Sequence, residues 1–224
     1  MSKTKVGIIL PSRGMIFARV IEEIEKTRQL PEFDIRLYII AGLPIPDAPN
    51  LLINKAMDEG AEYLWFVEED TVPPQDALPN LLKGFEAEPN VGVTCIDYAM
   101  HNNYSTVCRR TEMGEILFCG FGMTLVKREI FERMQRPYLR SDQLYNMGTN
   151  QWYEADPMKV YGHHDIYFGA QIRKMGYRIY QIPGECEHLK LVSMGSPQIN
   201  NGCHIIEPKG HVMYRYFVNS GIEI

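Results

Sequence analysis

The chain has 224 residues, of which 45% are hydrophobic and 23% are charged, and its formal net charge is −5. No apolar run approaches the roughly 20 residues that cross a bilayer, and the acidic balance argues against a protein whose main surface binds nucleic acid. Five cysteines without a Cys-x-x-Cys pair indicate reduced thiols rather than a disulfide framework. With no signal-peptide hydrophobic region after Met1, these features predict a cytoplasmic protein with one sizeable core.

The first half of the chain alternates apolar runs with amphipathic segments. Strands are predicted for residues 5–11, 33–41, 63–67 and 91–98, and helices for residues 16–30, 50–59 and 75–86. This alternation is typical of a parallel, doubly wound sheet. Such sheets bind ligands beyond the carboxyl ends of their strands. Ligand loops are therefore predicted at residues 11–14, 42–50 and 68–71.

The second half of the chain is more polar and less regular. It predicts a loop or hairpin over 101–114, strands over 115–119, 120–126 and 177–182, helices over 127–134 and 162–174, and a loop over 183–189. Two glycines beside a strand, Gly120 and Gly122, mark a place where the backbone approaches a ligand or another segment closely. The polar, aromatic stretch 137–160 is interpreted as an acceptor-side or lid region, and the tail 190–224 as a covering segment.

The most informative motif is Glu68-Glu69-Asp70, which follows the apolar run 63–67 and precedes two prolines. A strand buried on both faces that ends in carboxylates places them at the rim of the sheet. Carboxylates suit a hard divalent cation, and such a cation suits a phosphate. The alternative interpretation is a solvated acidic turn.

Two further residues bear on the chemistry. Asp165 stands at the start of a predicted helix, where it is either a cap that favours the helix dipole or a functional carboxylate. His188 is isolated in Glu185-Cys-Glu-His-Leu189, so it is either a structural histidine or a metal ligand.

Taken in order, the acidic triplet, the glycine pair Gly120-x-Gly122, Asp165 and His188 resemble the GT-A glycosyltransferases. The resemblance is to the family 2-like group and its short, phage-encoded forms, and it spans roughly residues 5–190. It implies a Rossmann-like GT-A fold, with a mixed, mostly parallel sheet flanked by helices. One domain would then cover 1–224, with a nucleotide-sugar half at 1–98, an acceptor and catalytic half at 99–190, and the covering segment 191–224.

The resemblance also implies an activity. It predicts metal-dependent transfer of a sugar, with inversion, from a nucleotide-sugar donor to an acceptor hydroxyl. Asp70 and His188 would hold Mn²⁺ or Mg²⁺, and Glu68 takes the place of the first Asp of the family's Asp-x-Asp motif, where it contacts the metal, the ribose or neither. Because a hydroxyl is a poor nucleophile, Asp165 would act as its base, although His164 departs from the family's acidic neighbour at that position.

The resemblance and the predicted loops together define the donor and acceptor sides. The donor-binding residues are predicted to be Pro11, Ser12, Arg13, Asp47, Glu68, Glu69 and Gly120. The acceptor side is predicted to include Trp152, Tyr153 and His164. The acceptor itself stays open among a glycan, a small molecule and, for a phage-encoded enzyme in the host cytoplasm, a modified DNA base.

Three other functions stay open. Transfer with retention would need a different arrangement of groups. Nucleotidyl transfer would favour a glycine-rich first loop with a lysine, whereas Pro11-Ser-Arg-Gly14 has one glycine and no lysine. A non-catalytic sugar-binding module would need no metal.

Overall fold

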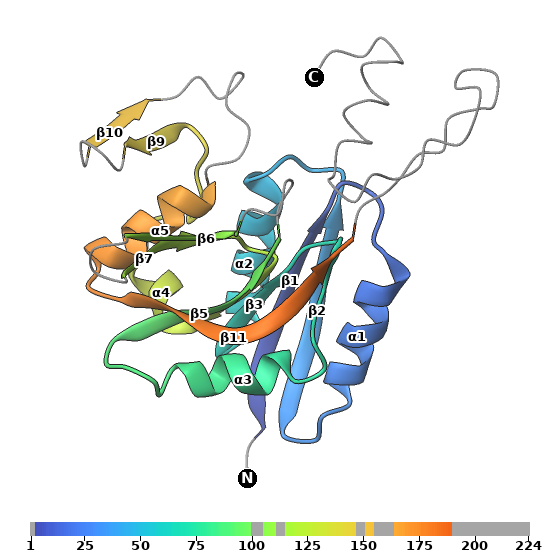
Figure 1. Ribbon diagram of the computed structural model, residues 1–224. Helices are drawn as coiled ribbons and strands as arrows, with labels where there is room; N and C mark the ends of the chain where they lie inside the picture. Colours follow the sequence, from blue (N-terminus) through green and yellow to red (C-terminus); the bar gives the residue numbers. More distant parts are fainter. Residues whose placement is uncertain (1–2, 100–104, 111–114, 147–150, 155–163, 190–224) are drawn as a thin grey trace, which may run out of the picture.

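The computed structural model describes residues 3–99, 105–110, 115–146, 151–154 and 164–189. Its centre is a curled seven-stranded sheet in the order β2-β1-β3-β8-β5-β11-β4 (Figure 1). The strands are β1 (Thr4–Ser12), β2 (Phe33–Ala41), β3 (Tyr63–Val67), β4 (Thr71–Val72), β5 (Val91–Tyr98), β8 (Met123–Lys127) and β11 (Arg178–His188). Strands β8 and β4 pair antiparallel with their neighbours, and the other pairs are parallel. The predicted mixed, mostly parallel sheet is therefore confirmed.

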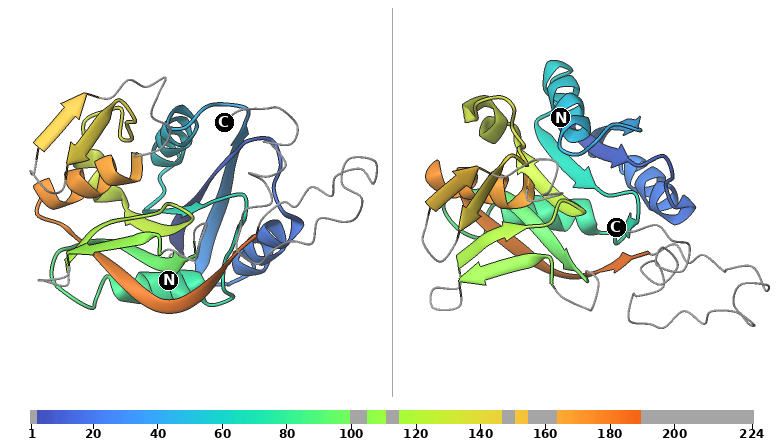
Figure 2. Two further views of the ribbon diagram at one scale, coloured as in Figure 1. Left: turned by 45° about the horizontal axis from the view of Figure 1, so that its top comes forward. Right: turned by 90° about the horizontal axis from the view of Figure 1, so that it is seen from above.

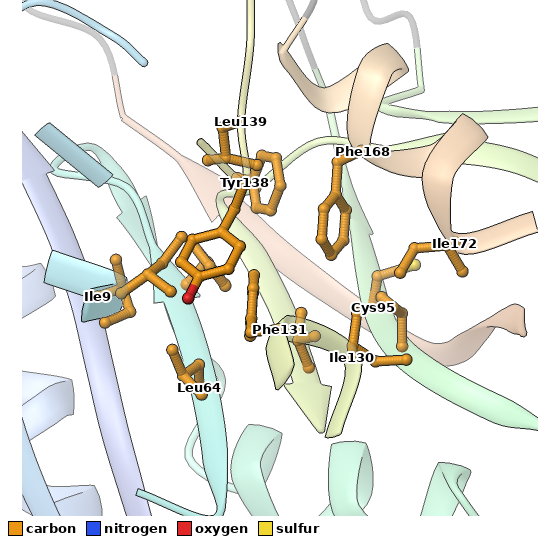
Figure 3. Close-up of a cluster of buried hydrophobic side chains, with 14 of the residues drawn as sticks. Ile9, Leu64, Cys95, Ile130, Phe131, Tyr138, Leu139, Phe168 and Ile172 are labelled. Carbon is orange, nitrogen blue, oxygen red and sulfur yellow. The ribbon is translucent and has the colours of Figure 1, made fainter. Parts of the chain in front are cut away.

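Helices cover both faces of this sheet. They are α1 (Ala18–Arg28), α2 (Asp47–Asp58), α3 (Ala77–Gly84), α4 (Arg128–Arg133) and α5 (His164–Lys174). Buried residues of α1 and α3 share one core cluster, and those of α2, α4 and α5 share the other, which Figure 3 shows. No helix in the described part of the chain is long and apolar enough to cross a membrane.

Strand β1 shows why an apolar run folds at the centre of this sheet. Ile8 and Leu10 belong to the cluster under α1, whereas Ile9 belongs to the cluster under α2, so alternate side chains are buried on opposite faces. Helix α1 buries Val20 and Ile24, four residues apart, which is the spacing of one helical face. The parallel strands all end at the same edge, and their carboxyl ends position the site.

Two small hairpins lie outside the main sheet. Strands β6 (Val107–Arg110) and β7 (Glu115–Cys119) form one, and β9 (Gln143–Asn146) and β10 (Gln151–Glu154) form the other. Helix α5 contacts β7 and β9, and Figure 2 shows both hairpins on the side of α5. The stretch 137–160, predicted without regular structure, therefore contains a hairpin.

The predicted loop over 183–189 is wrong, because β11 continues to His188. The pairing of β11 with β5 shifts register between Ile182 and Cys186. Pro183 and Gly184, which favour a loop, lie in this bulge, and the strand continues after it. The Cys186 thiol then donates to the carbonyl of Val72 at 3.1 Å. Burial raises the pKa of this thiol to about 12, so the thiol stays protonated and unreactive. Its hydrogen bond to Val72 links β11 to β4.

Helix α5 packs so closely on β7 that one position requires glycine. A Cβ on Gly169 would lie 2.7 Å from the Cβ of Phe118 and still closer to the carbonyl oxygen of Leu117. In an exposed helix, Gly→Ala stabilises by up to about 1 kcal/mol. Here we expect Gly169→Ala to destabilise by about 1–3 kcal/mol through overpacking, as measured by urea unfolding. Gly184→Ala, with its nearest neighbour at 3.4 Å, is the control, and a stabilised Gly169→Ala protein would contradict this packing.

Candidate metal centre and donor cavity

The acidic segment Glu68-Glu69-Asp70 forms a tight turn between β3 and β4. The N–H of Thr71 donates to the carbonyl of Glu68 at 3.2 Å, which closes the turn. Glu69 and Asp70 are each only 7% exposed. Because burying a carboxylate costs free energy unless it is paired or hydrogen-bonded, the partners of each residue indicate what it does.

Glu69 holds the loop that follows β1. Its Oε2 accepts hydrogen bonds from the Ser12 hydroxyl at 2.7 Å and from the backbone N–H of Arg13 at 2.8 Å. Its Oε1 accepts a hydrogen bond from Nε of Arg13, and its backbone carbonyl accepts the N–H of Phe17 at 3.0 Å. The Glu69 carboxylate thus accepts hydrogen bonds from protein donors and positions Ser12 and Arg13.

Glu68, Asp70 and His188 come together to form a candidate metal centre. One ligand atom from each lies within 4.8 Å of the others. The antiparallel pairing of β4 with β11 sets His188 opposite Thr71, next to Asp70. As a result, Nε2 of His188 lies 3.3 Å from Oδ2 of Asp70. Asp70 and His188, which sequence analysis assigned to the metal, and Glu68, whose contact it left open, are therefore neighbours in space.

The orientation of His188 suits a metal ligand. Its Nδ1 lies 2.7 Å from the carbonyl oxygen of Ala99. A carbonyl can only accept, so Nδ1 carries the hydrogen of this bond. In a neutral imidazole, the lone pair is then on Nε2, which faces Asp70. A histidine whose second nitrogen donates to a backbone carbonyl is the usual arrangement around a bound metal.

Tyr98, at the carboxyl end of β5, contacts residues of the candidate metal centre and was missed by sequence analysis. Its buried hydroxyl accepts the N–H of Gly122 at 2.8 Å and donates to Oε2 of Glu68 at 3.2 Å. Its ring also packs edge-on against the ring of His188, with centroids 5.3 Å apart. Burial, and then the charge of Glu68, raises the pKa of Tyr98 well above its ordinary value, so the hydroxyl stays protonated as a donor. Tyr98 thus orients ligands on both sides of the metal centre.

The glycine pair leaves room for this tyrosine. A Cβ on Gly120 would lie 2.6 Å from the Tyr98 hydroxyl, and a Cβ on Gly122 would lie 2.5 Å from Cζ of the same ring. Both distances are too short for real carbon contacts. Of the two causes that the sequence left open, a close approach by another segment therefore explains the pair, and donor binding at Gly120 stays a prediction.

We expect Tyr98→Phe to weaken binding of Mn²⁺ by about 10–100-fold, because this is the usual effect of losing a group that orients a metal ligand. The substitution also leaves the buried N–H of Gly122 without its acceptor, at a cost of about 1–3 kcal/mol. Isothermal titration with Mn²⁺ measures the first effect. Tyr63→Phe is the matched control, since Tyr63 begins β3 at its far end. Equal Mn²⁺ affinity in Tyr98→Phe and the wild-type protein would refute the role of Tyr98.

A cavity of about 250 Å³ opens beside the metal centre. The three ligand loops predicted from the sequence all contribute to its wall. The lining residues are Pro11, Ser12, Arg13, Leu43, Ile45, Glu68, Glu69, Asp70, His164 and His188. The apolar Leu43 and Ile45 were not predicted individually, although their loop was. The Arg13 side chain is 73% exposed, and its guanidinium lies 3.6 Å from Asp70 on the cavity wall, where a ligand can reach it.

Of the predicted site residues that the structure describes in full, Asp47, Gly120 and Asp165 do not line this cavity. Asp47 is the first residue of α2, and Asp165 accepts the N–H of Ile166 at 2.8 Å at the start of its own helix. Trp152 and Tyr153 lie on β10, and their side chains are outside the described part of the structure. Their role as acceptor contacts stays a prediction.

Comparisons with known proteins show the fold alone. No family model matches the chain, and no curated protein matches it either. Among solved structures, A197 from STIV has a TM-score of 0.58 and 17% identity, with 84% of this chain and 86% of that chain covered. The mannosyltransferase PcManGT from Pyrobaculum calidifontis, solved with GDP-Man and Mn²⁺, has a TM-score of 0.48 and 14% identity. That match covers 83% of this chain and 56% of the mannosyltransferase.

The fold is GT-A-like. Its curled, mostly parallel sheet with helices on both faces matches the fold class predicted from the sequence. The antiparallel β8 lies between β3 and β5, at the centre of the sheet. The candidate metal centre lies where the carboxyl ends of β3, β5 and β11 converge, which is the ligand edge of such sheets.

Proposed function

We propose that this protein is a metal-dependent glycosyltransferase that moves a sugar, with inversion, from a nucleotide-sugar donor to an acceptor hydroxyl. The observation that carries the proposal is the convergence of Glu68, Asp70 and His188 on the wall of one cavity with the loop after β1. A fold alone does not specify a function, so the proposal rests on this site and on the order of its motifs in the sequence.

The three side chains fit a divalent cation. Two carboxylates supply hard oxygen ligands, and the His188 imidazole presents Nε2 beside them. Carboxylates suit Mg²⁺ and Mn²⁺, and the added imidazole favours Mn²⁺. When bound, such an ion neutralises the negative charge of a diphosphate leaving group. The protein's part is to hold these ligands in place, which Tyr98 does for Glu68 and the Ala99 carbonyl does for His188.

The donor would enter beside Arg13. The cavity, at about 250 Å³, is smaller than the roughly 300–1,000 Å³ of typical ligand sites. A nucleotide sugar would therefore fill it and continue into the open space at its mouth. Leu43 and Ile45 offer an apolar surface for a base or a sugar ring, and the exposed guanidinium of Arg13 suits a phosphate oxygen.

A panel of nucleotide sugars, screened with and without Mn²⁺, tests the proposal. We expect one nucleoside diphosphate to raise the melting temperature only when Mn²⁺ is present, and its sugar derivative to be turned over slowly with water as acceptor. Release of a sugar 1-phosphate, by attack at the phosphorus next to the nucleoside, would instead indicate nucleotidyl transfer. Binding of a sugar without metal and without turnover would indicate a binding module. No stabilisation by any nucleoside diphosphate would overturn the transferase proposal.

A further inference from the structure

His164, the first residue of α5, occupies a distinctive position in the site. It lines the cavity of about 250 Å³ together with Glu68, Asp70 and His188. It also lines the narrow apolar slot next to that cavity, beside Phe121. Its ring stacks on the ring of Phe121, with centroids 5.5 Å apart and planes 8° from parallel. This stacking fixes the plane of the imidazole against the floor of the site.

The other lining side chains that can accept a proton belong to two assemblies. Within the described part of the chain, the lining side chains that can accept a proton are Glu68, Glu69, Asp70, His164 and His188. Glu69 is occupied by Ser12 and Arg13. Glu68, Asp70 and His188 form the candidate metal centre. His164 is the lining group with no part in either assembly.

The neighbouring carboxylate is placed differently. Asp165, expected from the sequence to be the base, accepts the N–H of Ile166 and does not line the cavity. An aspartate in the first turn of a helix stabilises that helix by bonding its free N–H groups and complementing its dipole. The structure therefore favours the capping role that the sequence left open for Asp165.

We propose that His164 is the catalytic base that takes the proton of the acceptor hydroxyl. The inference rests on the proposed transferase function. As the acceptor oxygen forms its bond to the anomeric carbon, the bond from that carbon to the diphosphate oxygen breaks, and its electron pair leaves with the nucleoside diphosphate. The hydroxyl proton passes to an imidazole nitrogen of His164. The positive charge that results is stabilised by the face of Phe121.

The test compares His164→Ala with Asp165→Asn. General-base catalysis contributes about 10²–10⁴-fold, so His164→Ala should lose that much in kcat while its affinity for a nucleoside diphosphate with Mn²⁺ stays unchanged. Added imidazole should restore part of the rate, because it can occupy the space left by the side chain. Asp165→Asn should keep its rate within about threefold, a change below 1 kcal/mol.

The outcomes separate this inference from the proposed function. If the wild-type protein turns over a nucleotide sugar and His164→Ala does so at a similar rate, His164 is not the base, although the transferase proposal stands. Loss of rate in His164→Ala without rescue by imidazole, or with a loss of Mn²⁺-dependent nucleotide binding, would indicate a structural role and overturn the inference. If the wild-type protein turns over no nucleotide sugar, the transferase proposal and this inference fail together.

Discussion

Replacing Asp70 with asparagine is expected to weaken Mn²⁺ binding by more than about 100-fold, since losing a group that only orients a ligand already costs 10–100-fold. Asp70 is the buried carboxylate of the candidate metal centre, with Oδ2 3.3 Å from Nε2 of His188. Asparagine keeps the shape of the side chain but not its charge. The backbone carbonyl that accepts the N–H of Leu189 at 2.7 Å is also retained. The metal-free protein should therefore remain folded.

Isothermal titration and thermal melting with Mn²⁺ measure this effect. A ligand that binds the folded state raises its melting temperature in proportion to the logarithm of ligand concentration, so the Mn²⁺-induced shift should disappear in Asp70→Asn. Asp34→Asn is the matched control. Asp34 is an exposed carboxylate near the amino end of β2, and its replacement should leave the shift unchanged. An unchanged Mn²⁺ affinity in Asp70→Asn would place the ion elsewhere.

Replacing Glu69 with alanine is expected to lower stability by about 2–3 kcal/mol. The buried carboxylate accepts hydrogen bonds from Ser12, from the backbone N–H of Arg13 and from its guanidinium. Removing an acceptor leaves a buried donor unsatisfied, which costs about 1–3 kcal/mol. The charge attraction between Arg13 and Glu69 adds little to the stability, because the Arg13 side chain is 73% exposed to solvent. For a chain of this size the loss corresponds to a fall of about 4–12 °C in melting temperature.

Differential scanning calorimetry of Glu69→Ala measures that fall. Glu69→Gln is the companion variant, because its amide oxygen still accepts one hydrogen bond and should retain part of the stability. Glu22→Ala removes an exposed glutamate that pairs with Lys26 along α1, and its melting temperature should hardly change. If Glu69→Ala and the wild-type protein have the same melting temperature, the carboxylate does not hold the loop after β1.

Much of the site's location could be predicted from the sequence. The run 63–67 had to be a central strand because it is apolar throughout, and the carboxylates after it had to lie at the ligand edge of a parallel sheet. The same logic placed the loops 11–14 and 42–50 around one cavity. The predicted positions of these loops depend only on the direction of each strand. The alternation of strands and helices along the chain determines that direction, because it predicts parallel strands.

The missed features depend on contacts between distant parts of the chain. The strand that brings His188 to Asp70 was missed, because Pro183 and Gly184 suggested a loop, whereas β11 continues beyond a bulge and pairs with β4. Tyr98 and Glu69 each act through side-chain hydrogen bonds to other strands or loops, which no periodicity reveals. A tyrosine at the end of a buried strand, together with two nearby glycines, was the available signal for Tyr98. Asp165, for which the sequence allowed either a helix cap or a functional carboxylate, accepts the N–H of Ile166 within its own helix.

Anomalous diffraction at the manganese edge tests the central claim most directly. Crystals grown with Mn²⁺ and a nucleoside diphosphate should show one strong anomalous peak coordinated by Glu68, Asp70 and His188, which already lie within 4.8 Å of one another. The diphosphate should lie against that peak, in the cavity beside Arg13. A peak bound by other residues, or no peak at this edge of the sheet in crystals that contain the nucleotide, would contradict the assignment of this site as a metal-dependent transferase centre.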